Sequence, residues 1–173
     1  MKLYPAIDLK DSKCVRLLQG DYNEVTVYGN NPGEMAKKWE SLGGDFLHIV
    51  DLDGAKAGKG INGEAIRQIV EAVSIPIELG GGIRTIEDIK VQLERGVNRI
   101  ILGSAAIKNK ALVKEAIDTL KGNGPKDLAQ VCLNLAANMT YTESEIDELV
   151  RNAKQEDSGA TATPAKVEIN LNF

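Results

Sequence analysis

Cysteine, histidine and long apolar runs are scarce in this sequence. Its 173 residues include two cysteines, Cys14 and Cys132, and a single histidine, His48. Two cysteines at no metal-ligand spacing exclude a disulfide framework and fit a reducing compartment. No apolar run approaches the ~20 residues of a membrane span, and the amino-terminal residues have no signal-peptide core. We therefore expect a cytoplasmic protein with no membrane partner.

Positive charge is in short supply as well. The chain has 21 Lys and Arg against 25 Asp and Glu, a net charge of -4, and no basic block. Nucleic-acid binding depends on clustered Lys and Arg, so this class of partner is excluded. The remaining composition, 43% hydrophobic and 27% charged, is that of an ordinary globular domain. The length is sufficient for one well-packed core.

Strand and helix patterns alternate regularly in the first two thirds of the chain, as in parallel α/β folds. Expected strands are 3–9, 46–51, 75–79 and 99–102, with a hairpin through 14–19; expected helices begin near 31, 62, 85 and 109. Thr85 and Asp88 have the spacing of a capping box. After a breaker at 121–125, the pattern predicts helices over 127–139 and 142–155 and a strand over 167–173. The predicted fold is (βα)4 followed by two helices and a strand.

Two glycine turns carry the clearest functional signal. Gly80-Gly81-Gly82-Ile83-Arg84 and Gly103-Ser104-Ala105-Ala106 follow two consecutive expected strands. A turn from a strand into a helix N-terminus presents backbone N–H groups that attract anions. We expect Gly81, Gly82, Gly103 and Ser104 to form a phosphate-binding cup. The alternative is that the glycines only permit tight loops.

Residues 5–9, 14–17 and 48–55, together with the two glycine turns, are similar to a known family. They resemble phosphoribosylformimino-AICAR ribotide isomerase of histidine biosynthesis over residues 1–116. The resemblance implies half of a TIM barrel with parallel strands, because that family forms (β/α)8 barrels whose two halves look alike. It also implies conversion of an aminoaldose to an aminoketose on a substrate with a phosphate at each end. No metal or organic cofactor is implied.

The same resemblance implies roles for individual residues. Asp8 would transfer protons, with a partner aspartate on the fifth barrel strand, and Arg16 and His48 would lie near the substrate. His48 has a structural alternative, because a lone histidine on an apolar strand is often a satisfied core group. Asp51 and Asp53 follow the second parallel strand, where capping or loop roles are equally open. No partner aspartate and no second pair of phosphate turns can be identified downstream.

Residues 113–139 resemble a helical segment of pyrimidine-nucleoside phosphorylases. We therefore interpret the chain as a chimera, engineered or produced by non-homologous recombination, with a half-barrel over 1–116 and a foreign helical tail over 117–173. The expected function is binding of phosphate or a phosphosugar at one cup, without turnover. The alternative function is a phosphoribosyl isomerase.

An open four-stranded sheet needs a cover for its apolar face. One solution is that the tail packs on it. The other is a homodimer through the open sheets, of the isologous type. Such a dimer would place Asp8 of each chain in one site, and is the form in which we expect any isomerase activity.

Overall fold

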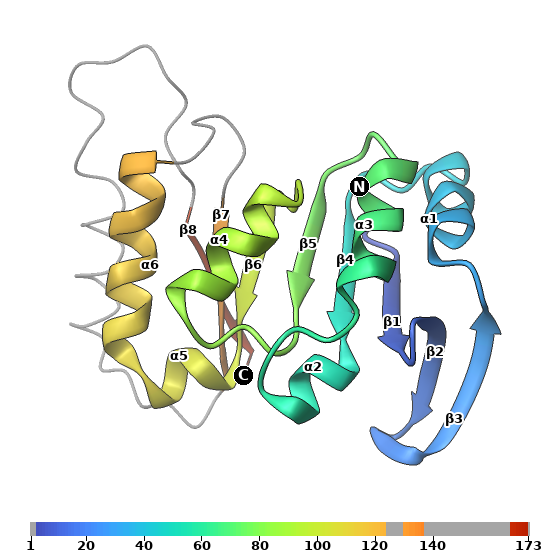
Figure 1. Ribbon diagram of the computed structural model, residues 1–173, viewed down its shortest axis with the longest axis horizontal. Coiled ribbons are helices and arrows are strands. Elements are labelled where there is room, and N and C mark those ends of the chain that lie inside the picture. The colour runs from blue at the N-terminus through green and yellow to red at the C-terminus, as the bar shows by residue number, and fades with distance from the viewer. Residues whose placement is uncertain (1–2, 124–129, 137–166, 173) are drawn as a thin grey trace.

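The computed structural model describes residues 3–123, 130–136 and 167–172, with side chains up to Ile117. They form one eight-stranded sheet in the order β3-β2-β1-β4-β5-β6-β7-β8, with helices on one face (Figure 1). Strands β1, β4, β5, β6, β7 and β8 are parallel, whereas β2 and β3 add to one edge antiparallel. The strands are β1 (Ala6–Lys10), β2 (Lys13–Leu18), β3 (Asp21–Gly29), β4 (Leu47–Asp51), β5 (Ile77–Gly80), β6 (Arg99–Leu102), β7 (Gln130–Ala136) and β8 (Val167–Asn172), and the helices are α1 (Pro32–Ser41), α2 (Leu52–Ala57), α3 (Gly63–Ala72), α4 (Ile86–Glu94), α5 (Ser104–Lys108) and α6 (Lys110–Asn123).

The predicted fold class, α/β with the parallel strands of a partial TIM barrel, is confirmed. Local sequence signals explain where the helices begin. Asn31 caps α1 by accepting a hydrogen bond from the Glu34 amide, with Pro32 in the first turn. Thr85 and Asp88 form the predicted capping box at the start of α4.

The expected helix over 127–139 is wrong in its described part, because residues 130–136 form strand β7. Val131, Leu133 and Leu135 recur at every second position, as in a strand. The same segment also fits the helical spacing on which the expected helix is based. Tertiary pairing decides between the two patterns, since β7 adds to β6 in parallel register from Arg99↔Gln130 onward. The expected carboxy-terminal strand is confirmed as β8, which pairs with β7. The expected helix over 142–155 lies outside the described residues.

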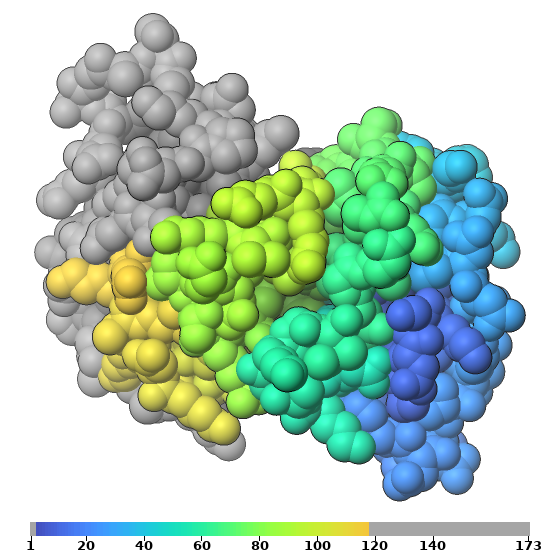
Figure 2. Space-filling model, in the orientation of Figure 1, coloured from blue at the N-terminus to red at the C-terminus, as the bar shows by residue number. Residues whose placement is uncertain are grey.

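The hydrophobic core lies between the sheet and its helices. Leu9, Ile49 and Leu79 of the strands are fully buried, as are Ile69 and Ile89 of the helices. In Figure 2 the side chains of α2, α3, α4 and α6 fill this face and hide most of the strands behind them. Among the described residues, no helix has the length and apolarity needed to cross a membrane.

Side chains alternate between the two faces of a strand. The residues that neighbour the core positions therefore project from the sheet face that lies opposite the helices. This set includes Asp8, His48 and Glu78, each between two buried apolar residues of β1, β4 or β5. It also includes Arg99, the first residue of β6, which is the register partner of Glu78. In a closed barrel this face is the interior.

Candidate functional site

The carboxyl ends of the parallel strands meet at one edge of the sheet. In Figure 1 the arrows of β1, β4 and β5 point to the lower edge of the view, where the short helices α2 and α5 also lie. Asp8 lies within β1, and the two glycine turns follow β5 and β6. The structure thus brings the expected catalytic residue and the expected cup residues to one end of the sheet, where β/α barrels place their active sites.

Asp8 is accessible at this edge. Its side chain is 19% exposed, and Arg16 Nη1 on β2 lies 3.8 Å from Asp8 Oδ2. The Arg16 side chain is 72% exposed, so solvent screens this ion pair and it adds little to stability. The contact nevertheless places a cation beside the carboxylate, as expected for two residues near an anionic ligand.

The turn after β5 requires glycine for a structural reason. Gly81 and Gly82 have φ values of 102° and 77°, a region that other residues rarely adopt. A Cβ at Gly81 would collide with the carbonyl oxygen of Asp51, and one at Gly82 would come within 2.7 Å of the Lys59 carbonyl carbon. Close backbone packing therefore gives both glycines a structural reason, and phosphate binding at this turn stays a prediction. The following helix, α4, is capped by its own Thr85 and Asp88.

The turn after β6 differs. Gly103 has φ of -88°, and a Cβ there would meet nothing within 4 Å. Packing within the described residues therefore does not require glycine at this position. Ser104 follows as the first residue of α5. Because no described atom occupies the place of a side chain at Gly103, a ligand can approach the backbone closely there.

Asp51 and Asn62 form a buried network that the sequence did not predict. The Asp51 carboxylate accepts hydrogen bonds from the backbone amides of Gly54, Ile61 and Asn62 at 2.8, 2.9 and 3.1 Å. The Asn62 amide group donates to Asp51 at 2.7 Å and to Asp53 at 2.9 Å, and its oxygen accepts from the Ser12 amide at 2.8 Å. Asp51 thus caps α2, which selects the capping alternative for that residue.

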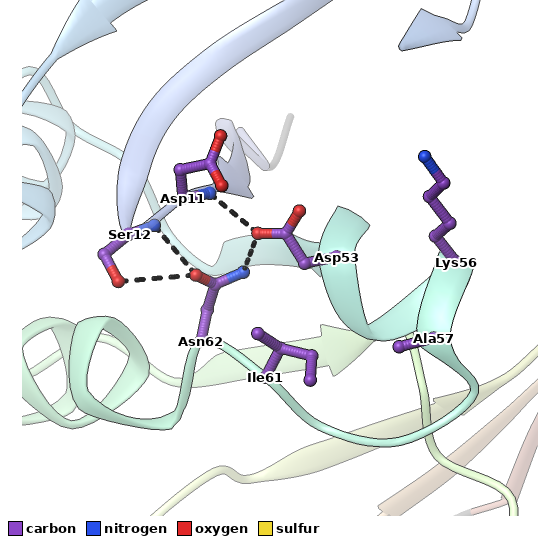
Figure 3. Close-up of a pocket in the computed structure, with 7 residues that line it drawn as sticks. All are labelled: Asp11, Ser12, Asp53, Lys56, Ala57, Ile61 and Asn62. Atoms are coloured by element: carbon purple, nitrogen blue, oxygen red, sulfur yellow. Dashed lines mark hydrogen bonds between the residues drawn. The ribbon is translucent and has the colours of Figure 1, made fainter.

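Figure 3 shows the cavity beside this network, with Asn62 between Ser12 and Asp53. Its volume is ≈ 540 Å³. The lining residues are Asp11, Ser12, Asp53, Lys56, Ala57, Ile61 and Asn62. Asp11 and Ser12 have φ values of 49° and 59° and form the tight turn between β1 and β2. The Asn62 contact and the bond from the Asp11 amide to Asp53 (2.7 Å) hold that turn against the β4–α2 connection.

His48 lies on the sheet face opposite the helices. It contacts Glu78, which in turn contacts Arg99, and neither of these charged residues is among those predicted from the sequence. His48 Nδ1 is 2.6 Å from Glu78 Oε1, and Arg99 Nη1 donates to Glu78 Oε2 at 2.9 Å. The signal that could have identified them is a single charged residue within each of two otherwise apolar strands, β5 and β6. Within the described part of the chain, no group of three or more His, Cys, Asp or Glu side chains is arranged to hold a metal ion.

A sheet of parallel strands with its candidate residues at the carboxyl ends defines part of a β/α-barrel protein. The chain belongs to the family described as "Histidine biosynthesis protein", whose model matches residues 2–156. It is 52% identical over 122 residues to the 1-(5-phosphoribosyl)-5-((5-phosphoribosylamino)methylideneamino) imidazole-4-carboxamide isomerase of Ruminiclostridium cellulolyticum, covering 70% of this chain and 52% of that protein. The identically named protein of Geotalea uraniireducens is 57% identical over 122 residues, covering 70% of this chain and 50% of its own length. The chain spans about half the length of the curated relatives it matches.

These comparisons correct two interpretations. The chimera interpretation is wrong, because the family model continues through residue 116, the expected junction, to residue 156, and the relatives are natural bacterial proteins. The comparisons give no support to the phosphorylase resemblance of residues 113–139. The expectation of an inactive engineered half-barrel is contradicted as well, since every relative reported above is named as an isomerase. The alternative function, the isomerase, fits the comparisons better.

Proposed function

We propose that this chain acts in the isomerase reaction for which its relatives are named, on a phosphoribosyl substrate. The observation that carries the proposal is the identity of about half the residues over a stretch of 122, together with the family match over residues 2–156, which include the Asp8 strand and the two glycine turns. Fold alone would not carry it, because barrels host many chemistries. The proposal therefore depends on the residues that these strands place at one edge of the sheet.

Asp8 is the proposed proton-transfer residue. Conversion of an aminoaldose to an aminoketose removes a proton from C2 and returns one to C1, so a carboxylate that accepts and a carboxylic acid that donates serve the two steps. Asp8 is exposed enough to contact a substrate and has the Arg16 guanidinium 3.8 Å away. Arg16 would hold a substrate anion beside it, because a guanidinium pairs well with phosphate.

The proposed phosphate ligands are the backbone N–H groups of the two turns. Gly81 packs against the Asp51 backbone and Gly82 against the Lys59 and Gly54 backbones, which fixes where the N–H groups of the first turn point. Gly103 and Ser104 offer the more accessible turn, because a Cβ at Gly103 would meet no described atom within 4 Å. Preorganised N–H groups of this kind bind phosphate without any metal.

A second copy of the chain is the proposed source of the second carboxylate. The face that carries Asp8 is the one opposite the helices, and in a symmetric dimer the two Asp8 side chains would share one cleft. The geometry is demanding, because a misplacement of ~1 Å costs on the order of 100-fold in rate.

The test is an isomerase assay of the full chain with Asp8→Asn, and with Asp21→Asn, at the exposed first residue of β3, as the matched control. We expect a loss of about 100-fold or more for Asp8→Asn and an unchanged rate for Asp21→Asn. Light scattering over the same concentrations should show that specific activity rises with the dimer fraction. Activity that survives Asp8→Asn would refute the assignment of Asp8, and full activity in a monomer would refute the shared cleft.

A further inference from the structure

Three charged side chains form a continuous row across neighbouring strands. The parallel register pairs His48 with Glu78 and Glu78 with Arg99, so the three side chains project from the same sheet face. The contacts follow this order, with 2.6 Å from His48 Nδ1 to Glu78 Oε1 and 2.9 Å from Arg99 Nη1 to Glu78 Oε2. Glu78 therefore uses one carboxylate oxygen for each neighbour.

The Glu78 end of this row is fixed. Glu78 and Arg99 are each 8% exposed, and the Arg99 guanidinium lies over the Phe46 ring at 4.6 Å, so neither can swing into water. Burial raises the pKa of Glu78, but the hydrogen bond from His48 and the charge of Arg99 outweigh it and keep the pKa below its ordinary value. Glu78 is accordingly a carboxylate, and a carboxylate only accepts hydrogen bonds.

A carboxylate at Nδ1 determines the state of the His48 ring. Because Glu78 can only accept, the ring must carry a proton on Nδ1, and the neutral ring then has a bare Nε2. Within the described residues the His48 ring makes no other hydrogen bond, and the side chain is 34% exposed. His48 stands two positions before Val50, the register partner of Asp8, so Asp8 and His48 share one face.

We propose that Glu78 and Arg99 are positioning residues that hold His48 with its proton on Nδ1, so that Nε2 accepts a hydrogen bond from a hydroxyl of the bound sugar phosphate. The ligand in this statement rests on the proposed function, whereas the state of the ring does not. Arg99 acts through Glu78, and Glu78 acts through His48. The same carboxylate–histidine arrangement fixes ring orientation at many metal and catalytic sites.

The single histidine of the chain makes the test direct. With ¹⁵N-histidine labelling, one pair of ring signals reports which nitrogen carries the proton, at pH 9, well above the usual histidine range near 6.5. We expect Nδ1 in the protonated range and Nε2 in the unprotonated range. In the double variant Glu78→Leu/Arg99→Met, which removes the acceptor without leaving a buried unpaired charge, the Nδ1 signal should move toward the unprotonated range.

The matched control is Glu64→Leu/Arg67→Met, which removes an exposed ion pair of α3 (2.6 Å) on the helix-covered side of the sheet. We expect unchanged ring signals in this control. A wild-type ring with Nδ1 unprotonated, or with both nitrogens protonated, would overturn the proposal without any variant. Ring signals that do not change in Glu78→Leu/Arg99→Met would overturn it too.

The ligand half of the proposal is tested with ribose 5-phosphate as the probe. Saturable shifts of the Gly103 and Ser104 amides should accompany a shift of His48 Nε2, and the double variant should bind about five- to tenfold more weakly, as expected for one lost hydrogen bond. Amide shifts without a shift of Nε2 would refute contact between His48 and the sugar. Absence of every shift would refute the proposed phosphate site, while the ring signals still decide whether Glu78 positions His48.

Discussion

Asn62→Ala should destabilise the protein through the loss of a buried set of hydrogen bonds. Asn62 stands at the N-cap position of α3, yet it makes no side-chain capping bond there. Its amide group instead joins Asp51, Asp53 and the Ser12 backbone. The side chain therefore connects three chain segments: the β1–β2 turn, the start of α2 and the start of α3.

The expected loss follows from those three contacts. Hydrogen bonds to charged groups contribute ~1.5–3 kcal/mol each and neutral ones ~1 kcal/mol, which gives about 4–7 kcal/mol for two bonds to carboxylates and one to an amide. The variant recovers part of this free energy, because Asp51 keeps its three backbone donors. Water from the adjoining cavity can also reach Asp53 and replace the lost donor. We expect a net loss of about 2–4 kcal/mol in the free energy of unfolding.

Urea unfolding followed by fluorescence measures this loss, because Trp39 is the single tryptophan and packs against the core. With an m-value of ~2 kcal/mol/M, the midpoint should fall by about 1–2 M. Asn23→Ala is the control, since Asn23 is exposed and its hydrogen bonds reach only Asp21; it should change stability by less than ~0.5 kcal/mol. Equal midpoints for the two variants would show that the Asn62 network contributes nothing to stability.

Three further predictions concern single positions. Gly81→Ala should lower the free energy of unfolding by about 2 kcal/mol or more, because of its φ of 102° and the collision of a Cβ with the Asp51 carbonyl oxygen. Gly103→Ala should lower it by less, because a Cβ there meets no described atom within 4 Å; equal losses in thermal unfolding would contradict the different packing of the two glycines. Thr85→Ala should cost about 1 kcal/mol through loss of the α4 capping box, measured by urea unfolding, and no change would mean that the cap is replaceable by water. Hydrogen bonds from Ser74 lower the pKa of Glu40 from its ordinary 4.5, so its contribution to stability is present above about pH 4.5 and is lost as pH falls through the lower folded value. Glu40→Gln should therefore lose less stability than the wild type between pH 7 and pH 3, and parallel losses would contradict this role.

The sequence predicts most of the fold because local and tertiary signals agree there. Strand β6 has the predicted bounds 99–102, and the capping box of α4 is visible in the spacing of Thr85 and Asp88. The prediction and the structure disagree at β7, because its apolar residues fit both a helical and a strand period. Pairing with β6 decides in favour of the strand. The short helices α2 and α5 have six and five residues, too few for a helical period to be recognised.

The candidate site is predictable only in part, because its buried polar contacts depend on which strands become neighbours. Asp8 and the glycine turns are recognisable from motifs along the chain. Asn62, by contrast, reaches Ser12 across 50 residues of sequence, and Glu78 meets His48 across 30. A charged residue within an apolar strand is a local signal at Glu78, but its partner His48 is known only once the register of β4 and β5 is known.

The two glycine turns, which look equivalent in the sequence, have different physical roles. Gly81 and Gly82 are required by positive φ and by the Asp51 and Lys59 backbones, so their presence would be expected even in a protein that binds no anion. Gly103 has no such requirement among the described residues. Loss of phosphate binding after Gly103→Ala would therefore be informative about the ligand, whereas the same loss after Gly81→Ala would also follow from a displaced Asp51. The contribution of backbone N–H groups to the proposed anion site is therefore tested more directly at the turn after β6 than at the turn after β5.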